Sequence, residues 1–136
     1  MINENKKPVY EFFNYVSDDN FEGALSVLDT DIVWTIIGDT PVSKTFHGLK
    51  DVEENLLQEI FRCTKREAGI TLEVIETISE GNKVVARVQG NVEAIYGPYN
   101  NTYCHVFTVK DGKIIEDIEY LDTALVHKTW YGKTLS

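Results

Sequence analysis

The sequence is short of the residues on which several classes of protein depend. It has two cysteines among 136 residues, Cys63 and Cys104, and these lie far apart with no CxxC or Cys/His ligand spacing. A disulfide framework or a structural zinc site therefore has no support. Basic residues are also scarce, with 13 Lys and Arg against 22 Asp and Glu and a net charge of −9. This balance argues against nucleic acid or an anionic membrane as a partner, because a polyanion is repelled and counterion release requires basic residues.

Long apolar segments are missing as well. No apolar run approaches the length that spans a bilayer, and the opening MINENKKPVYEFF lacks the apolar core and cleavage pattern of a signal peptide. We therefore expect no membrane partner and a cytoplasmic location. The sequence also shows no metal cluster, phosphate loop, nucleophile elbow or dinucleotide fingerprint, so we expect no metal and no cofactor.

What is present is an ordinary globular composition. The chain is 43% hydrophobic and 26% charged, which is typical of one soluble domain with a real core. We predict a single domain over residues 1–136, with a core of about 8–127 and tails at 1–7 and 128–136.

Hydrophobic periodicity predicts the elements of this domain. Helical spacing places apolar residues at 9, 12, 13 and 16, again at 21, 24, 25 and 28, and in a third helix over 49–61. A buried strand is predicted over 32–37, a hairpin from 70–74 and 83–95, and a second hairpin over 103–122. The order α-α-β-α-β-β-β-β predicts an α+β fold with helices gathered on one face of an antiparallel sheet.

The last hairpin carries the candidate site. Its turn, Lys110 to Lys113, contains the Asp-Gly pair that tight hairpins favour. Because strand side chains alternate, one face holds Tyr103, His105, Phe107 and Val109 on the first arm, and one face of the second arm holds Asp117, Glu119 and Leu121. A histidine and two acids could therefore meet across a single surface.

Four segments carry a resemblance to a known family: DNFEGAL at 19–25, DIVW at 31–34, FHGLKDV at 46–52, and KDGKI at 110–114 with EYLD at 119–122. In order and spacing the chain resembles the nuclear-transport-factor-2-like superfamily, in particular its SnoaL-like and ketosteroid-isomerase-like members. The resemblance implies a strongly curved, cone-shaped sheet wrapped around three N-terminal helices. It also implies a ligand cavity in the mouth of the cone and a homodimer formed through the outer face of the sheet.

The resemblance also implies roles for particular residues. Phe12, Thr35 and His105 stand near the positions of the steroid isomerase's oxyanion-hole tyrosine, base aspartate and protonated aspartate, so we expect no steroid isomerase activity. The SnoaL-like cyclases place a histidine on the penultimate strand and a carboxylate on the last, which His105 and Glu119 match. Arg87 and Glu119 resemble two members of the epoxide-hydrolase triad, but the third position is Gln89, and an amide cannot replace a carboxylate there.

The residues themselves leave alternatives open. Glu119 is either a solvated carboxylate on the wet face of its strand or a group lining the cavity. Arg87 and Gln89 share this ambiguity, because their strand mates Val84, Ala86, Val88 and Val92 form the cleaner apolar face. His105 is either a hydrogen-bonded core residue or a catalyst tuned by Glu119 or Asp117, and without that role Asp117 is expected to be a surface acid.

The resulting hypothesis is a protein that binds a small hydrophobic or polyketide-like molecule. One hypothesis makes this protein a cofactor-independent isomerase, cyclase or hydrolase, with Glu119 as base and His105 as its partner. The alternative is a non-catalytic ligand-binding or dimerisation module of the same fold. Residues expected to bind the ligand are Arg87, Gln89, Asp117, Phe12, Trp34, Ile60, Phe107 and Leu121.

Overall fold

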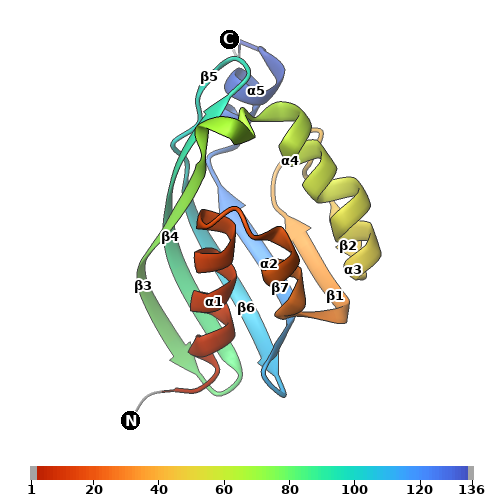
Figure 1. Cartoon of the computed structure of the whole chain (residues 1–136), viewed down its shortest axis with the longest axis vertical. Helices are drawn as coiled ribbons and strands as arrows, with labels where there is room; N and C mark the ends of the chain where they lie inside the picture. Colours follow the sequence, from red (N-terminus) through yellow and green to blue (C-terminus); the bar gives the residue numbers. More distant parts are fainter. Residues whose placement is uncertain (1–2, 135–136) are drawn as a thin grey trace.

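The computed structural model describes residues 3–134 and places all the longer helices around one curved sheet (Figure 1). The first two helices are α1 (Lys6–Ser17) and α2 (Phe21–Ser26). A long helix follows in three parts, α3 (Leu49–Asp51), the π-helical η1 (Val52–Leu57) and α4 (Gln58–Cys63). A short 3-10 helix, η2 (Arg66–Ala68), precedes the sheet hairpins, and α5 (Thr123–Tyr131) comes last.

The sheet has seven strands in the order β2-β1-β7-β6-β4-β3, with β5 paired to β4. The strands are β1 (Leu28–Ile36), β2 (Thr45–His47), β3 (Ile70–Glu80), β4 (Lys83–Ala94), β5 (Gly97–Pro98), β6 (Thr102–Lys110) and β7 (Lys113–Leu121). The fold is α+β, as predicted, but the sheet is mixed because β1 pairs with β7 in parallel. The long helix between β2 and β3 carries the chain across the inner face, so β3 lies at the far edge of the sheet and β1 adjoins the last strand, β7.

The N-terminal helices form as their spacing predicts. The apolar stripe of α1, formed by Val9, Phe12, Phe13 and Val16, is buried. The side chain of Asn20 caps α2 by accepting a hydrogen bond from the Gly23 amide. Leu28, predicted to end this helix, instead begins β1 and is buried there.

The β6–β7 hairpin closes on the predicted turn. Asp111 and Gly112 have φ values of 51° and 76°, which is the left-handed pair that a two-residue type I′ turn requires. The register places His105 opposite Glu119 and Phe107 opposite Asp117. The predicted inner face therefore forms as one surface across two strands.

The C-terminal segment is more ordered than predicted. Asp122 caps α5 by accepting from the Leu125 amide, and the helix continues to Tyr131 with Trp130 buried. Helix α1 likewise begins at Lys6, so both expected tails contribute helix to the domain. Residues 1–2 and 135–136 of those tails lie outside the described residues.

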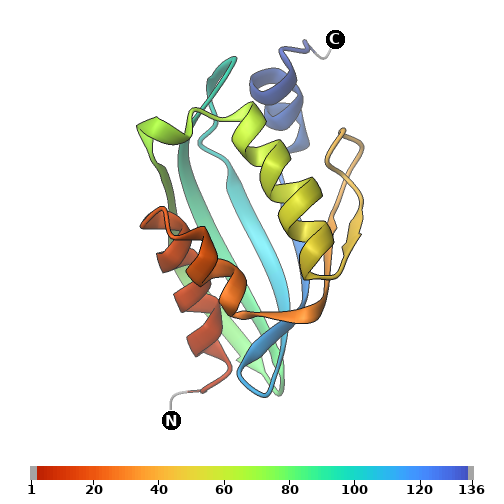
Figure 2. The same ribbon diagram turned by 45° about the vertical axis from the view of Figure 1, so that its right-hand side comes forward.

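Among residues 3–134, the helices lie on one face of the sheet and leave the other uncovered. Figure 2 shows α1 and α2 beside one part of the inner face and the long helix beside another, with α5 at the end of the molecule where the chain terminates. The buried apolar cluster lies between these helices and the sheet. Within residues 3–134, no helix has the length and apolar character needed to cross a membrane.

Candidate functional site

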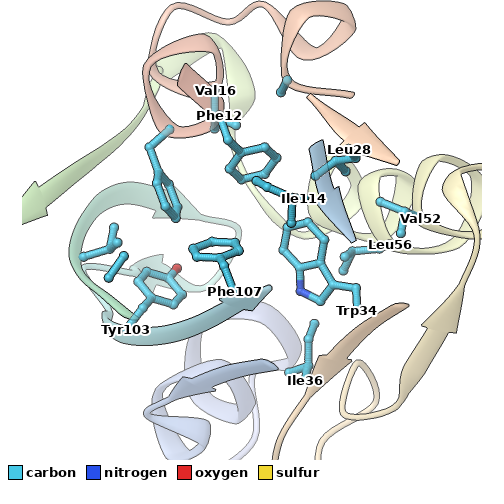
Figure 3. Packing of buried hydrophobic residues seen from close by; sticks show 14 of the residues in the cluster. Phe12, Val16, Leu28, Trp34, Ile36, Val52, Leu56, Tyr103, Phe107 and Ile114 are labelled. Atoms are coloured by element: carbon cyan, nitrogen blue, oxygen red, sulfur yellow. The ribbon is translucent and has the colours of Figure 1, made fainter. Parts of the chain in front are cut away.

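A cavity of about 110 Å³ lies inside the cone, between the helices and the inner face of the sheet. Its wall is largely apolar, and Figure 3 shows Phe12, Trp34 and Leu56 converging there from a helix, a strand and the π-helical segment. Four of the residues expected to bind the ligand lie on this wall: Phe12, Trp34, Ile60 and Leu121. The imidazole of His105 and the carboxylate of Glu119 also lie on this wall.

The first polar feature is a buried pair between His105 and Asp117. The Nδ1 atom of His105 lies 2.9 Å and 3.0 Å from the two carboxylate oxygens of Asp117. The two side chains are 4% and 0% exposed, so water does not screen their interaction. The carboxylate therefore fixes the orientation of the imidazole ring.

Glu119 lies directly across the ladder from His105 and is held by a different partner. The indole Nε1 of Trp34 donates a hydrogen bond of 3.1 Å to its Oε1 atom. The Oε1 atom is thus anchored from β1, on the far side of β7 from His105. His105, Asp117 and Glu119 together form the polar cluster of the cavity.

Burial dominates the electrostatics of this polar cluster. Burial is the main reason that the pKa of Glu119 rises from 4.5 to about 7, and the charge of Asp117 raises it further. The charge of His105 and the hydrogen bond from Trp34 lower this pKa, but by less. Burial also raises the pKa of Asp117, although His105 opposes this. For His105, burial lowers the pKa, but the charge and hydrogen bond of Asp117 outweigh it, so the net pKa is raised. A base with a pKa near neutrality is suited to proton transfer at physiological pH.

Aromatic rings hold the imidazole in place. The ring of His105 stacks on Phe107 at 5.2 Å with an interplanar angle of 4°, and the edge of Phe13 meets it at 5.2 Å. Phe107 was expected to touch the ligand, but it is fully buried in this stack and does not line the cavity. It supports the site through His105.

Three sequence expectations need correction. Asp117 was expected to bind the ligand, but it does not line the cavity. It is completely buried as the partner of His105, which is one of the roles left open for it. Arg87 and Gln89 lie on the opposite face of β4 from the cavity, where Arg87 pairs with Glu76 and Gln89 binds backbone carbonyls of the following turn. The apolar set of β4 faces the helices, so its polar set must face outward.

Two hydroxyl groups on the cavity wall were missed as site residues. Tyr103 shares the inward parity of His105 on β6, and that parity could have identified it. Tyr99 lies in the turn before β6, where no periodic pattern points to burial, yet it is only 3% exposed. Thr35, by contrast, faces away from the cavity and contacts Thr45.

The polar cluster also has the composition of a metal site. One ligand atom from each of its three residues lies within 4.8 Å of the others. One imidazole and two carboxylates suit a divalent ion. Both oxygens of Asp117 are already directed at Nδ1 of His105, so an ion would compete with the imidazole for this carboxylate.

Comparison with known families agrees with this architecture. Residues 9–117 match the sequence model of the SnoaL-like domain. The chain belongs to the SnoaL-like domain family. No curated protein sequence matches it.

Solved structures extend the likeness across the whole domain. An NTF2-like protein of unknown function from Burkholderia pseudomallei superposes with a TM-score of 0.83 at 21% identity, covering 95% of the SnoaL-like chain and 98% of the other. A putative isomerase from Bacillus subtilis superposes with a TM-score of 0.81 at 17% identity, and the match covers 99% of this chain and 100% of the isomerase. An LEH-like epoxide hydrolase from M. tuberculosis superposes with a TM-score of 0.73 at 19% identity, and the match covers 95% of this chain and 90% of the hydrolase. These identities establish the shared fold alone.

Proposed function

We propose that this protein is a cofactor-independent acid–base enzyme that moves a proton at a carbon atom of a small, mostly apolar substrate. The observation that carries the proposal is Glu119, a buried carboxylate whose pKa is raised to about 7, on the wall of an apolar cavity. Carboxylates buried in apolar surroundings beside a specific charged partner are typical of catalytic bases.

The proposed step is abstraction of a proton from a carbon next to a carbonyl group. The C–H bond breaks, its electron pair forms a carbon–carbon double bond, and the carbonyl π electrons move to oxygen, while Glu119 takes the proton. Return of that proton to another carbon of a conjugated enolate completes an isomerisation without any co-reactant, whereas return to the same carbon regenerates the substrate. His105 favours the ionised form of Glu119, and Asp117 holds His105 in position.

Cyclohexanone is a suitable probe, because the cavity of about 110 Å³ is comparable to the ~150 Å³ apolar cavity that admits benzene. In D₂O, NMR should show deuterium entering the carbons beside the carbonyl faster with the wild-type protein than in buffer. Glu119→Gln should reduce this rate about 100-fold, the usual contribution of a positioned base. Asp111→Asn, in the exposed turn, should leave it unchanged. A wild-type rate equal to that of buffer contradicts the proposal.

A second candidate is a ligand-binding module without chemistry, and one observation favours it. Nδ1 of His105 bonds to Asp117 and Oε1 of Glu119 accepts from Trp34, so each side chain of the polar cluster has a protein partner, as in a structural core network. A protein that binds cyclohexanone but exchanges no protons in the same experiment belongs to this second class.

We also propose that the outer face of the sheet forms a homodimer. The pairing registers align Ile78, Val85, Val106 and Ile118 in one apolar row across β3, β4, β6 and β7. Ile78 is 65% exposed, and the helices cover only the opposite face. A second copy of the chain would bury this row symmetrically.

Sedimentation at micromolar concentration tests the dimer. The wild-type protein should show twice the 15.5 kDa chain mass. The Val106→Lys variant should sediment with the mass of a single chain, because its ammonium group would lie in the middle of the apolar row. The matched variant Thr102→Lys changes an exposed position near the end of the same strand and should remain dimeric. A wild-type protein that sediments as one chain contradicts the proposal.

A further inference from the structure

Two aromatic rings close the cavity on its helical side, where α2 faces the long helix. Phe21 is the first residue of α2, and it lies on the cavity wall. Phe61, near the end of α4, does not line the cavity, but its ring meets that of Phe21 edge to face with centroids 4.9 Å apart. The two rings therefore span the boundary between α2 and α4.

Arg66, the first residue of η2, covers both rings. Its guanidinium carbon lies 4.8 Å from the ring centroid of Phe21 and 4.3 Å from that of Phe61. Its Nε donates a 2.8 Å hydrogen bond to Oδ1 of Asp19, in the turn between α1 and α2. The Arg66 side chain is 41% exposed, so Phe21 faces the cavity and Arg66 faces the solvent. The Arg66 bridge is the set of these four residues: Asp19, Phe21, Phe61 and Arg66.

The backbone holds the parts of the Arg66 bridge without filling the space between them. Asp19 has a φ of 57°, a left-handed conformation that aspartate tolerates, and it turns the chain between α1 and α2. On the other side, the amide of Lys65 donates to the carbonyl of Glu93, which ties the start of η2 to β4. Among residues 3–134, Figure 2 shows no helix or strand in front of the sheet between α2 and α4. Side chains alone make this contact, and they move faster than the backbone around them.

The cavity has a second cover, α5, which is harder to displace. Trp130 lines the cavity, and the hydroxyl of Tyr131 donates to Oε2 of Glu59 on α4 at 2.5 Å. Moving α5 would expose Trp130 and Val126, which are 6% and 1% exposed, and would lose their apolar burial. Opening the Arg66 bridge breaks an exposed ion pair and cation–π contacts at the surface, which are weak interactions. The Arg66 bridge is therefore the easier of the two covers to open.

We propose that the Arg66 bridge is a gate through which a small apolar molecule enters and leaves the cavity. The gate opens when Arg66 leaves the two rings and Phe21 turns aside, while the sheet and the long helix stay in place. This inference rests on the proposed function only in that the cavity takes up a small molecule, so it applies equally to an enzyme and to a binding module. Because the gate is closed both before and after binding, it sets the rates of entry and exit and leaves the affinity unchanged.

Fluorobenzene is a suitable probe, because it is close in size to benzene, which apolar cavities admit, and ¹⁹F NMR follows it directly. Exchange spectroscopy measures its dissociation rate, and a titration measures its affinity. Arg66→Gln removes the cation from both rings and should raise the dissociation rate about tenfold, with an affinity within about twofold of the wild-type value. Arg66→Lys keeps the charge but not the flat guanidinium group, and should give an intermediate rate.

Two further measurements separate a gate from a general loosening of the helices. Arg62→Gln is the matched control, because Arg62 pairs with Glu59 on the same long helix and is not part of the Arg66 bridge. It should leave the dissociation rate unchanged. Raising NaCl from about 0.05 M to about 0.5 M should speed dissociation from the wild-type protein about twofold, because salt screens the exposed Arg66–Asp19 pair. The same change should have no effect on the rate in Arg66→Gln.

Tyr131→Phe tests the other cover by removing the hydroxyl that ties α5 to α4, and it should not change the dissociation rate. If it speeds dissociation as much as Arg66→Gln does, the ligand passes under α5 and the inference is overturned. It is overturned as well if the wild-type protein binds no fluorobenzene, or if Arg66→Gln weakens the affinity by the same factor as it raises the dissociation rate. Deuterium exchange separates the two proposals. A protein that shows the gated rates but exchanges no deuterium into cyclohexanone keeps the gate and loses the proposed chemistry.

Discussion

The two faces of the sheet carry ion pairs of almost the same length in opposite surroundings. On the inner face, His105 and Asp117 lie 2.9 Å apart and are 4% and 0% exposed. On the outer face, Arg87 and Glu76 lie 2.7 Å apart, and each is 53% exposed. The two ion pairs therefore do not differ appreciably in the distance between their charged atoms. The difference is the solvent, which screens the outer pair and is excluded from the inner one.

This contrast explains why only one face is a candidate site. An exposed pair contributes little, because it loses side-chain entropy and water competes for both charges. A buried pair leaves each group dependent on the other, and neighbouring carboxylates then acquire shifted pKa values. The same residue types are thus screened by water on one face and buried in a candidate site on the other.

The largest expected effect comes from removing one carboxylate from each pair. Asp117→Asn should lower the free energy of unfolding by about 3 kcal/mol or more at pH 6, because the buried imidazole loses its carboxylate partner and must either stay charged without one or give up its proton. Glu76→Gln makes the same chemical change on the outer face and should cost less than about 1 kcal/mol. Urea denaturation of both variants measures the difference. Equal losses would remove the distinction between the faces.

A second prediction concerns pH and Glu119. Its pKa in the folded protein, about 7, is above the ordinary value of 4.5, so the folded state retains a proton that the unfolded state releases. The associated stability is fully present below pH 4.5 and is lost as the pH rises through 7. The glutamine of the Glu119→Gln variant does not ionise, so the variant has no such pH-dependent loss of stability. The variant should therefore gain up to about 3 kcal/mol relative to the wild-type protein between pH 4.5 and pH 8.

Urea unfolding at several pH values checks this prediction. Glu76→Gln, on the outer face, serves as the control and should track the wild-type protein much more closely over the same range. A wild-type and Glu119→Gln difference that does not change with pH would show that Glu119 ionises as it does in the unfolded chain.

A third prediction tests the coupling within the polar cluster by NMR titration of His105. The charges of Asp117 and Glu119 both raise the pKa of this imidazole, and Asp117 has the larger effect. Asp117→Asn should therefore lower the His105 pKa most, Glu119→Gln should lower it less, and Asp111→Asn in the exposed turn should not change it. An unchanged titration in Glu119→Gln would mean that the two side chains do not interact, and would favour the non-catalytic reading.

The sequence predicts which residues share a face, and packing decides where that face points. Alternation correctly grouped His105 with Tyr103 on β6 and Asp117 with Glu119 on β7. It could not show that the polar set of β7 faces inward while that of β4, with Arg87, faces outward. That outcome depends on distant partners, such as Trp34, which is 85 positions from Glu119 and binds its carboxylate. The parallel pairing of β1 with β7 depends on the crossing helix and is likewise not visible in local periodicity.

The smallest expected effect comes from Arg87, one of the residues that the sequence analysis expected to bind the ligand. Arg87→Gln removes the cation of the outer pair and should change the free energy of unfolding by less than about 1 kcal/mol. Because its side chain lies on the far side of β4, the rate of deuterium exchange into cyclohexanone and the His105 titration should both stay as in the wild-type protein. His105→Gln is the matched change on the inner face and should alter the exchange rate, because Glu119 loses the cation that favours its ionised form. If Arg87→Gln slowed exchange as much as His105→Gln, the outer face would take part in the chemistry. The separation of roles between the two faces would then be wrong.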